Sequence, residues 1–220
     1  MAGRTARTER ASGTRAAIIT AAERLFAEHG VVAVSNRQIS EAAGQGNNTA
    51  VTYHFGTKNE LLRAIIRRHR APMDELRQRM LKEIGGSEEM RDWVACLVRP
   101  HTEHLAELGN PTWYARCVAQ VMADPVLRWI VIEEMTDPAL EHTLDGINRC
   151  RPVLPPPVRR ERGDMARHLL VHVMADRERA LADAAPTPRS SWDECATGLI
   201  DALMGLWLAP VTPLQVRSSS

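Results

Sequence analysis

Several features that would assign this chain to other protein classes are missing from its sequence. No run of 18 or more apolar residues occurs, so we expect no membrane span. The N-terminus is basic but is not followed by an apolar stretch, so we expect no secretory signal. Four cysteines are present, far apart and without a Cys-x-x-Cys pair: Cys96, Cys117, Cys150 and Cys195. This spacing is typical of reduced thiols in the cytoplasm rather than of a disulfide framework or a zinc site.

The patterns of common catalytic and metal sites are also missing. The sequence has no Gly-x-Ser-x-Gly turn, phosphate-binding glycine loop, His-Glu-x-x-His motif or paired carboxylates. Two histidine pairs, His101 with His104 and His168 with His172, have a spacing that could hold a metal, but no cysteine or carboxylate completes either set. We therefore expect no enzymatic activity, metal or cofactor, and interpret these histidines as surface or interface residues.

Charge is divided unevenly along the chain, although the formal net charge is only +1. Residues 1–70 contain 11 Lys or Arg against 5 Asp or Glu, which is +6, whereas residues 71–220 carry −5. This difference predicts an anionic partner for the first third alone. Charge by itself fits DNA, RNA and anionic lipid equally well.

Apolar residues recur at helical spacing along the whole chain, and no alternating pattern of useful length indicates a strand. The sequence therefore predicts an all-α protein of about nine helices. A helix over residues 14–29 ends at Gly30, and a Ser-x-x-Gln capping box at residues 35–38 begins a short second helix. Another capping box at residues 57–60 begins a longer helix, which leaves room for about two helical turns after Gly44.

Glycine and proline clusters suggest how the chain is organised. The Gly-Gly-Ser stretch at residues 85–87 and the proline-rich stretch at residues 152–157 each interrupt the helical pattern. An Asn or Asp before a proline, at Asn110, Asp124 and Asp137, is a common way to begin a helix. We expect a flexible basic arm (1–13), a helix-turn-helix domain (14–70), a helical ligand-binding and dimerisation domain (71–208) and a disordered tail (209–220).

Two short helices that meet at a glycine, after a longer helix, indicate a helix-turn-helix unit. The following stretch, GQGNNTAVTYHF, also has the composition of a surface turn, but its asparagines and threonines can bond base edges. Ala50, Val51 and Phe55 are expected to pack inward. Lys58, at the start of the next helix, is suited to a phosphate. The candidate DNA contacts are Arg37, Gln45, Asn47, Asn48, Thr49, Thr52, Tyr53, His54 and Lys58.

The segment from Thr14 to Leu62 resembles the DNA-binding domain of the tetracycline-repressor (TetR) family of bacterial transcription regulators. The resemblance rests on the order and spacing of Ile18, Ala22, Leu25, Phe26 and Gly30, then Arg37-Gln-Ile39, Ala42-Ala43-Gly44, Tyr53-His54-Phe55, Lys58 and Glu60-Leu61-Leu62. It implies that Tyr53 and His54 lie near phosphates, that Lys58 contacts the DNA backbone and that Phe55 packs inside. Two departures from the common pattern are a turn one residue longer, at residues 45–48, and a threonine at position 52 where an aromatic residue is frequent.

The larger C-terminal part contains all five tryptophans, together with methionines and cysteines that provide adaptable apolar surface. We interpret this composition as a pocket for a small, largely apolar molecule between the fifth, sixth and seventh helices, although each residue alone could belong to an ordinary core. The candidate ligand contacts are Trp93, Leu97, His101, Trp113, Cys117, Met122 and Trp129.

Apolar stripes on the last two long helices favour a dimer, because two such helices from each of two chains can form a four-helix bundle; packing of the stripes inside one chain is the alternative. The residues of these stripes are Met165, Leu169, Val173, Leu199, Leu203 and Leu206. A twofold dimer would place two reading helices about one DNA turn apart.

The sequence thus favours a homodimeric regulator that binds a palindromic double-stranded DNA operator and is released from it by a small-molecule effector. Repression follows from the family resemblance alone. A DNA-binding regulator without any effector is the alternative, in which the C-terminal part would have a filled core. An all-helical enzyme is the least supported interpretation.

Overall fold

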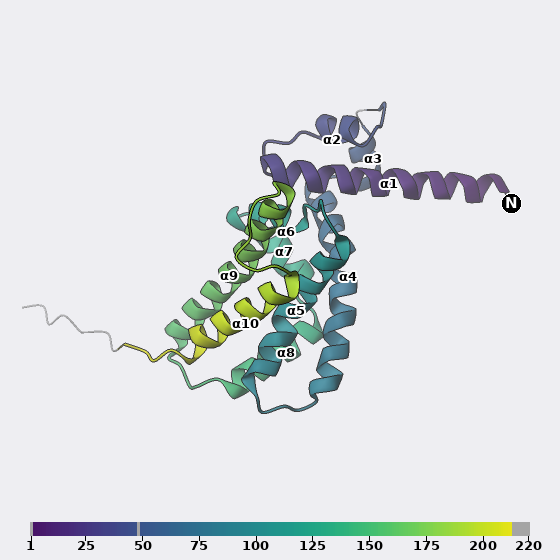
Figure 1. Cartoon of the computed structure of the whole chain (residues 1–220). Helices are drawn as coiled ribbons and strands as arrows, with labels where there is room; N and C mark the ends of the chain where they lie inside the picture. The colour runs from purple at the N-terminus through teal and green to yellow at the C-terminus, as the bar shows by residue number, and fades with distance from the viewer. Residues whose placement is uncertain (1, 48, 213–220) are drawn as a thin grey trace, which may run out of the picture.

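The structure, a computed structural model, describes residues 2–47 and 49–212 (Figure 1). These residues form ten α-helices and no strand, so the predicted all-α class is confirmed, with one helix more than expected. None of these helices is long and apolar enough to cross a membrane. In chain order the helices are α1 (Ala2–His29), α2 (Asn36–Ala42), α3 (Ala50–Phe55), α4 (Lys58–Ile84), α5 (Met90–Leu108), α6 (Tyr114–Ala123), α7 (Arg128–Met135), α8 (Pro138–Cys150), α9 (Pro156–Ala182) and α10 (Trp192–Leu208).

Helices α1, α2 and α3 and the first turns of α4 form a small unit at one end of the molecule, with α1 lying across the ends of the other helices (Figure 1). Its core consists of apolar side chains that the helical spacing places on facing sides: Phe26, Ile39, Val51 and Leu61 are all buried. Burial of these side chains holds the two short helices, which would be too short to be stable alone.

The capping box predicted for α2 is present. The Ser35 hydroxyl accepts a hydrogen bond from the backbone N–H of Gln38, and the Gln38 side chain accepts one from the backbone N–H of Ser35. Thr57 caps α4 by accepting a hydrogen bond from the backbone N–H of Glu60. Both helices therefore begin where the sequence predicts.

Residues 2–13, for which the sequence predicts a flexible arm, belong to α1 instead. Alanine and arginine, which favour helices, are the most frequent residues in this segment, and proline is absent from it. The expected domain boundary at residue 70 falls inside α4, with His69 and Met73 buried on either side of it. A continuous helix, rather than a linker, thus connects the small unit to the larger helical body.

Only one of the three expected Asn-Pro or Asp-Pro helix starts is a helix start. The Asp137 carboxylate accepts hydrogen bonds from two backbone N–H groups at the beginning of α8. The Asp124 carboxylate makes similar bonds in the turn before α7, and Asn110 lies in the connection before α6, bonded through its side chain to the Leu181 carbonyl. In these two places the polar side chain stabilises a connection instead of a helix end.

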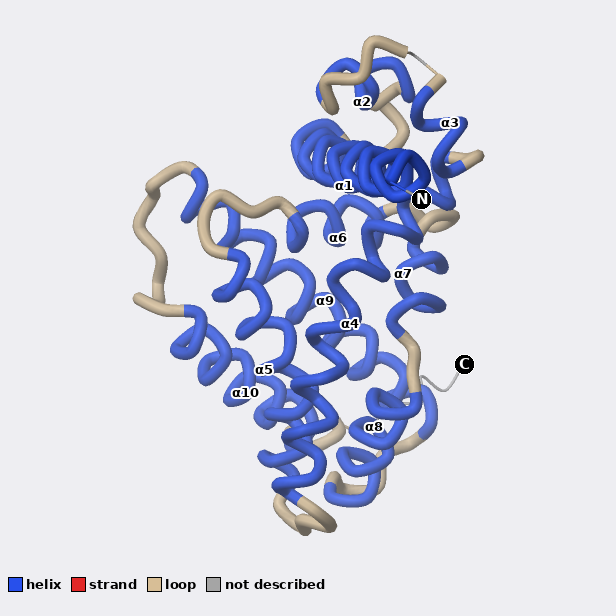
Figure 2. The backbone as a smooth tube through the Cα atoms, turned by 90° about the vertical axis from the view of Figure 1, so that its right-hand side faces the viewer, coloured by secondary structure: helices blue, strands red, loops and turns tan. Residues whose placement is uncertain are grey.

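The larger body is built around α5, which packs against α4, α8 and α10. Helix α6 lies between α1 and α9, so that α1 rests on the end of the body in Figure 2. Trp93 of α5 is fully buried and lies directly against Gly146 of α8. Residues 209–212 follow α10 without regular structure, and the remainder of the expected tail lies outside the described residues.

Candidate DNA-binding surface and ligand cavity

The surface predicted to contact DNA lies on α2, α3 and the turn between them, on the far side of α1 from the body (Figure 2). Of the nine candidate residues, five are exposed: Arg37, Asn47, Thr49, Thr52 and Tyr53. Gln45, His54 and Lys58 are half-buried, and Asn48 lies outside the described residues. Ala50, Val51 and Phe55 are buried, as predicted, so the polar side of α3 faces away from the core.

Tyr53 is 80% exposed, which is unusual for so large an aromatic side chain. Its ring meets the neighbouring His54 ring edge to face, at 5.0 Å between centroids. Thr52 is exposed beside it. The aromatic ring of Tyr53 and the hydroxyl of Thr52 are therefore accessible to a partner at this end of α3.

The turn before α3 is held by its own side chains. Gly44 has a positive φ of 68°, which lets the chain reverse after α2. The Asn47 side-chain oxygen accepts hydrogen bonds from the backbone N–H and the hydroxyl of Thr49, at 2.9 and 2.7 Å. Gln45 donates to the Ala43 carbonyl at 3.1 Å. Part of the hydrogen-bonding capacity assigned to base contacts is thus used to shape the turn.

Lys58 has an internal role that the sequence does not reveal. Its ammonium donates to the carbonyl oxygens of Val31, at 3.1 Å, and Val34, at 2.6 Å, and so ties the start of α4 to the segment between α1 and α2. An ammonium has three N–H donors. A phosphate contact from Lys58 would therefore have to use the third.

Arg15, which sequence reasoning did not select, lies at the same end of the molecule. Its guanidinium donates to the carbonyl of His54 at 3.0 Å and lies over the Phe55 ring, 4.2 Å from the centroid. This exposed cation of α1 therefore supports the C-terminal end of α3. The sequence gives no sign of this role, because the contact joins residues 39 positions apart.

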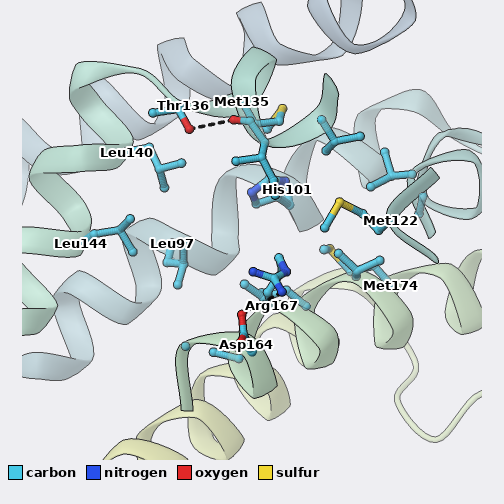
Figure 3. Close-up of a pocket in the computed structure, with 18 of the residues that line it drawn as sticks. Leu97, His101, Met122, Met135, Thr136, Leu140, Leu144, Asp164, Arg167 and Met174 are labelled. Atoms are coloured by element: carbon cyan, nitrogen blue, oxygen red, sulfur yellow. Dashed lines mark hydrogen bonds and ion pairs between the residues drawn. The ribbon is translucent and has the colours of Figure 1, made fainter. Parts of the chain in front are cut away.

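A cavity of about 560 Å³ lies in the body and is lined by α5, α6, α7, α8 and α9, with Trp207 of α10 (Figure 3). Its walls are mainly aliphatic and sulfur-containing, with a small group of polar side chains on α9. The lining includes Leu97, His101, Tyr114, Met122, Val131, Ile132, Met135, Leu140, Leu144, Arg160, Gly163, Asp164, Arg167, Met174 and Trp207. A volume of this size is typical of small-molecule sites, which run from about 300 to 1,000 Å³.

Three of the seven predicted ligand contacts line this cavity: Leu97, His101 and Met122. The prediction needs correction for the others, Trp93, Trp113, Cys117 and Trp129, which do not belong to its lining. Trp93 and Cys117 are buried in the core, Trp113 packs at its edge, and Trp129 is mostly exposed. Helical spacing identifies an apolar face but cannot tell whether that face meets a filled core or a cavity.

The polar side chains of the cavity differ in charge. Burial, together with the nearby Arg77 and His104, lowers the pKa of His101 to about 3, so the imidazole is neutral at pH 7. Arg167 and Asp164 form an ion pair at 2.8 Å between Nη2 and Oδ1. The Arg167 Nε is buried and has no hydrogen-bond partner among the described residues. Sequence reasoning assigned α9 to dimerisation and missed these groups.

A buried polar chain connects α1 to the wall of this cavity. His69 of α4 lies 2.8 Å from the Glu23 carboxylate of α1 on one side and 2.8 Å from His104 of α5 on the other. The Tyr114 ring, which lines the cavity, stacks on His69 with 3.9 Å between centroids. The cavity wall is therefore in contact with a side chain that touches α1.

A cluster of ion pairs connects α7 to α4. The Glu134 carboxylate accepts two hydrogen bonds from Arg67, both at 2.7 Å, and one from Arg63 at 3.0 Å. Burial acts to raise the pKa of Glu134, but these hydrogen bonds outweigh it and the pKa is lowered. Arg63 also pairs with the more exposed Glu133. Since α7 lines the cavity and α4 begins at α3, this cluster lies between the two candidate sites.

The stripes predicted for dimerisation are only partly on the surface. Met165 and Val173 of α9 are 44% and 37% exposed. Leu199 and Leu203 of α10 are instead buried in the chain's own core, where α10 packs against α5, which corrects the prediction for these two. The remaining stripe residues, Leu169 and Leu206, are half-buried.

Comparisons with known proteins agree with this architecture. The family model described as bacterial regulatory proteins, tetR family, matches residues 18–65. A second, described as tetracyclin repressor-like, C-terminal domain, matches residues 95–205, half of the chain. The HTH-type transcriptional repressor AcnR of Corynebacterium glutamicum is 35% identical over 143 residues, which are 60% of this chain and 64% of AcnR. The match thus spans somewhat less than two thirds of that relative.

Solved structures of two repressors share the fold. NalD, the secondary repressor of the MexAB-OprM multidrug efflux pump in Pseudomonas aeruginosa, is 23% identical, with a TM-score of 0.55 over 91% of this chain and 100% of that chain. SmeT, the repressor of the Stenotrophomonas maltophilia multidrug efflux pump SmeDEF, is 20% identical, with a TM-score of 0.53 over 92% and 97% of the two chains. At these identities the comparison concerns the fold alone.

Proposed function

Because the chain belongs to the TetR family of bacterial regulatory proteins, we propose that it is a homodimeric transcriptional repressor that a small, largely apolar ligand releases from a palindromic DNA operator. The observation that carries the proposal is the connection between α3 and the cavity through α4 and α7. Helix α4 begins directly after α3, and its Arg67 is bonded to Glu134 of α7, whose neighbours Val131 and Ile132 line the cavity.

DNA binding is supported by the exposed end of α3 and by the positive charge of the first 70 residues. Thr52 and Tyr53 would contact bases or phosphates, and exposed cations such as Arg37 would neutralise phosphates. Counterions released from the DNA then make the affinity depend steeply on salt concentration.

Dimerisation is supported by apolar side chains that α9 and α10 leave exposed: Met165, Val173 and Leu208. Burying them against a second copy would remove apolar surface from water. The dimer would have to hold two α3 helices roughly 34–36 Å apart to fit successive major grooves on one side of DNA.

Ligand control follows from the link between the cavity and α4. A ligand that prefers a different position of α7 would move α4 and change the separation of the two α3 helices. By thermodynamic linkage, operator DNA must weaken ligand binding by the same factor by which ligand weakens DNA binding.

The first test is selection from random duplex DNA at two salt concentrations, followed by sequencing of the retained fragments. A palindrome and a steep salt dependence are expected. Substituting Arg37→Ala should weaken binding and reduce the salt slope by about 2, since each chain of the dimer loses one cation. Arg159→Ala, the same change at an exposed position of α9, should leave the slope as it is. Selection of no motif, or affinity unaffected by the double substitution Thr52→Ala and Tyr53→Ala, would refute the DNA-binding proposal.

A further inference from the structure

We propose that the cavity selects amphiphilic anions: an apolar chain or ring system occupies the space between α5, α6, α7 and α8, and a single carboxylate binds Arg167 on α9. The inference rests on the proposed function, in which this cavity is the effector site, and it names the chemical class of that effector.

The apolar part of the ligand follows from the walls. Apolar side chains from four helices line the space: Leu97 of α5, Met122 of α6, Met135 of α7 and Leu140 of α8 (Figure 3). Methionine side chains adapt to irregular apolar shapes, and nothing in this part of the wall carries a charge. The affinity of this region would come from burial of apolar surface, which distinguishes poorly between ligands of similar size.

The anionic part follows from the charged groups of the lining. These all lie on one face of α9 and comprise two cations, Arg160 and Arg167, and one carboxylate, Asp164. His101, on the opposite wall, is neutral and adds no charge. The net charge of the lining is therefore +1, which one bound carboxylate would neutralise.

Arg167 lines the cavity and has a donor that lacks a partner among the described residues. A guanidinium has five N–H groups, and the ion pair with Asp164 uses Nη2. The Nε–H is buried without a hydrogen-bond partner among the described residues, although buried donors are nearly always bonded. A small turn of the side chain would direct this N–H into the cavity, where a carboxylate bound through Nε and a terminal nitrogen would satisfy it in the bidentate geometry for which arginine is suited. In Figure 3 the Arg167 guanidinium lies between the α9 ribbon and the apolar walls.

Gly163 leaves space next to this donor. It lies inside α9, where glycine is less favourable than alanine, and it lines the cavity between Arg160 and Arg167. A Cβ added at Gly163 would have no atom within 4 Å. Packing therefore does not require the glycine, whereas a ligand head group that reaches Arg167 would use the space.

The test uses the full chain and three probes with the same dodecyl chain: dodecanoate, dodecanol and dodecyltrimethylammonium. Binding is measured by calorimetry and by the fluorescence of Trp207, which lines the cavity, with Trp207→Phe to assign the signal. Dodecanoate is expected to bind about tenfold or more tightly than dodecanol, because hydrogen bonds to charged groups are the strong ones. The cationic probe should bind most weakly.

The matched variants separate the head group from the chain. Arg167→Leu should reduce dodecanoate affinity to that of dodecanol and leave dodecanol affinity unchanged. Arg159→Leu removes a cation from the exposed side of the same helix and should change neither. If Arg167→Leu fails to fold, Gly163→Leu serves instead, since it should block the approach to Arg167 and weaken dodecanoate more than dodecanol.

The outcomes distinguish failure of the anion preference from failure of the proposed regulation. Equal binding of dodecanoate and dodecanol, or preference for the cationic probe, overturns the inference and leaves the cavity as an effector site. No binding of any probe overturns the inference and removes the support for an apolar effector. Selective dodecanoate binding that does not release the selected operator supports the inference and contradicts the proposed regulation.

Discussion

Trp93 and Gly146 show how closely single residues depend on each other in this protein. The Trp93 indole is fully buried on α5, and the backbone of α8 approaches it so closely that a Cβ at position 146 would overlap its ring. The indole N–H donates to the Ser87 carbonyl at 2.9 Å, which fixes the ring in place. Trp93 therefore belongs to the rigid core and not to the ligand cavity.

We expect Gly146→Ala to destabilise the protein by about 1–3 kcal/mol, because a fully packed core accommodates an extra methyl group only by shifting its neighbours. The measurement is the free energy of unfolding from denaturant titration. Gly163→Ala is the control: the added methyl group meets no atom, so it should stabilise α9 by roughly 0.5–1 kcal/mol. Equal effects of the two substitutions would contradict the close packing of Trp93.

Burial also changes the roles of charged residues. Lys58 looks like a phosphate contact in the sequence, yet its ammonium bonds two carbonyl groups inside the DNA-binding unit. Arg167 looks like an ordinary surface residue of an amphipathic helix, yet its Nε is buried at the cavity. In both residues the chemical type was evident from the sequence, and the neighbours were not.

At the scale of whole helices, α9 carries residues of both the proposed dimer interface and the cavity. One face carries Met165 and Val173, assigned to dimerisation, and another carries Asp164 and Arg167 of the cavity. A ligand bound in the cavity would therefore touch the helix proposed to contact the partner chain. Helices α7 and α4 provide a second connection, from the cavity to the small N-terminal unit, through Glu134.

We expect Glu134→Gln to reduce the coupling between ligand and operator while ligand affinity in the absence of DNA changes little. The neutral amide would weaken the bonds to Arg67 and Arg63, so that movement of α7 reaches α4 less effectively. Coupling energies are typically about 1–3 kcal/mol, so the loss should appear as a several-fold smaller effect of ligand on operator affinity.

Glu133→Gln provides the control for this prediction. Glu133 pairs with the same Arg63, but its side chain is 60% exposed, and exposed ion pairs contribute little. Operator release is measured by titrating ligand into the protein–DNA complex of each variant. Unchanged release in Glu134→Gln, or an equal loss in Glu133→Gln, would contradict the role of this cluster.

At the scale of the whole molecule, acid should destabilise the fold through its buried neutral histidines. Burial lowers the pKa of His104 to about 4 and that of His101 to about 3. In the unfolded chain a histidine has a pKa of about 6.5. The unfolded state therefore binds more protons between these values, so the stability present above pH 6.5 is lost as the pH falls toward 4 and then 3.

Each of the two histidines should contribute a loss of roughly 1 kcal/mol per pH unit over this range. The measurement is the free energy of unfolding at a series of pH values. His101→Gln, which removes one of the two groups, should reduce the slope, and His29→Gln, at an exposed position, should leave it unchanged. A stability that does not change between pH 6.5 and 4 would show that these histidines are not held neutral.

The sequence predicted the all-α class, the capping box at Ser35, the inward side of α3 and membership of the TetR family, all of which are confirmed. These features depend on neighbouring residues, because helical period, caps and the helix-turn-helix motif each involve residues only a few positions apart. The same local patterns predicted the region of the cavity, but only three of the seven predicted contacts line it.

What the sequence by itself determined is therefore the all-α class and the small helix-turn-helix unit at the N-terminal end. Only the tertiary structure decided which apolar faces are filled and which are hollow. Trp93 meets Gly146 and is enclosed, whereas His101 faces Arg167 across a cavity, and both arrangements bring together residues more than fifty positions apart. Helical spacing states that a side chain points inward, but the space that remains there depends on the volumes of all the helices that meet.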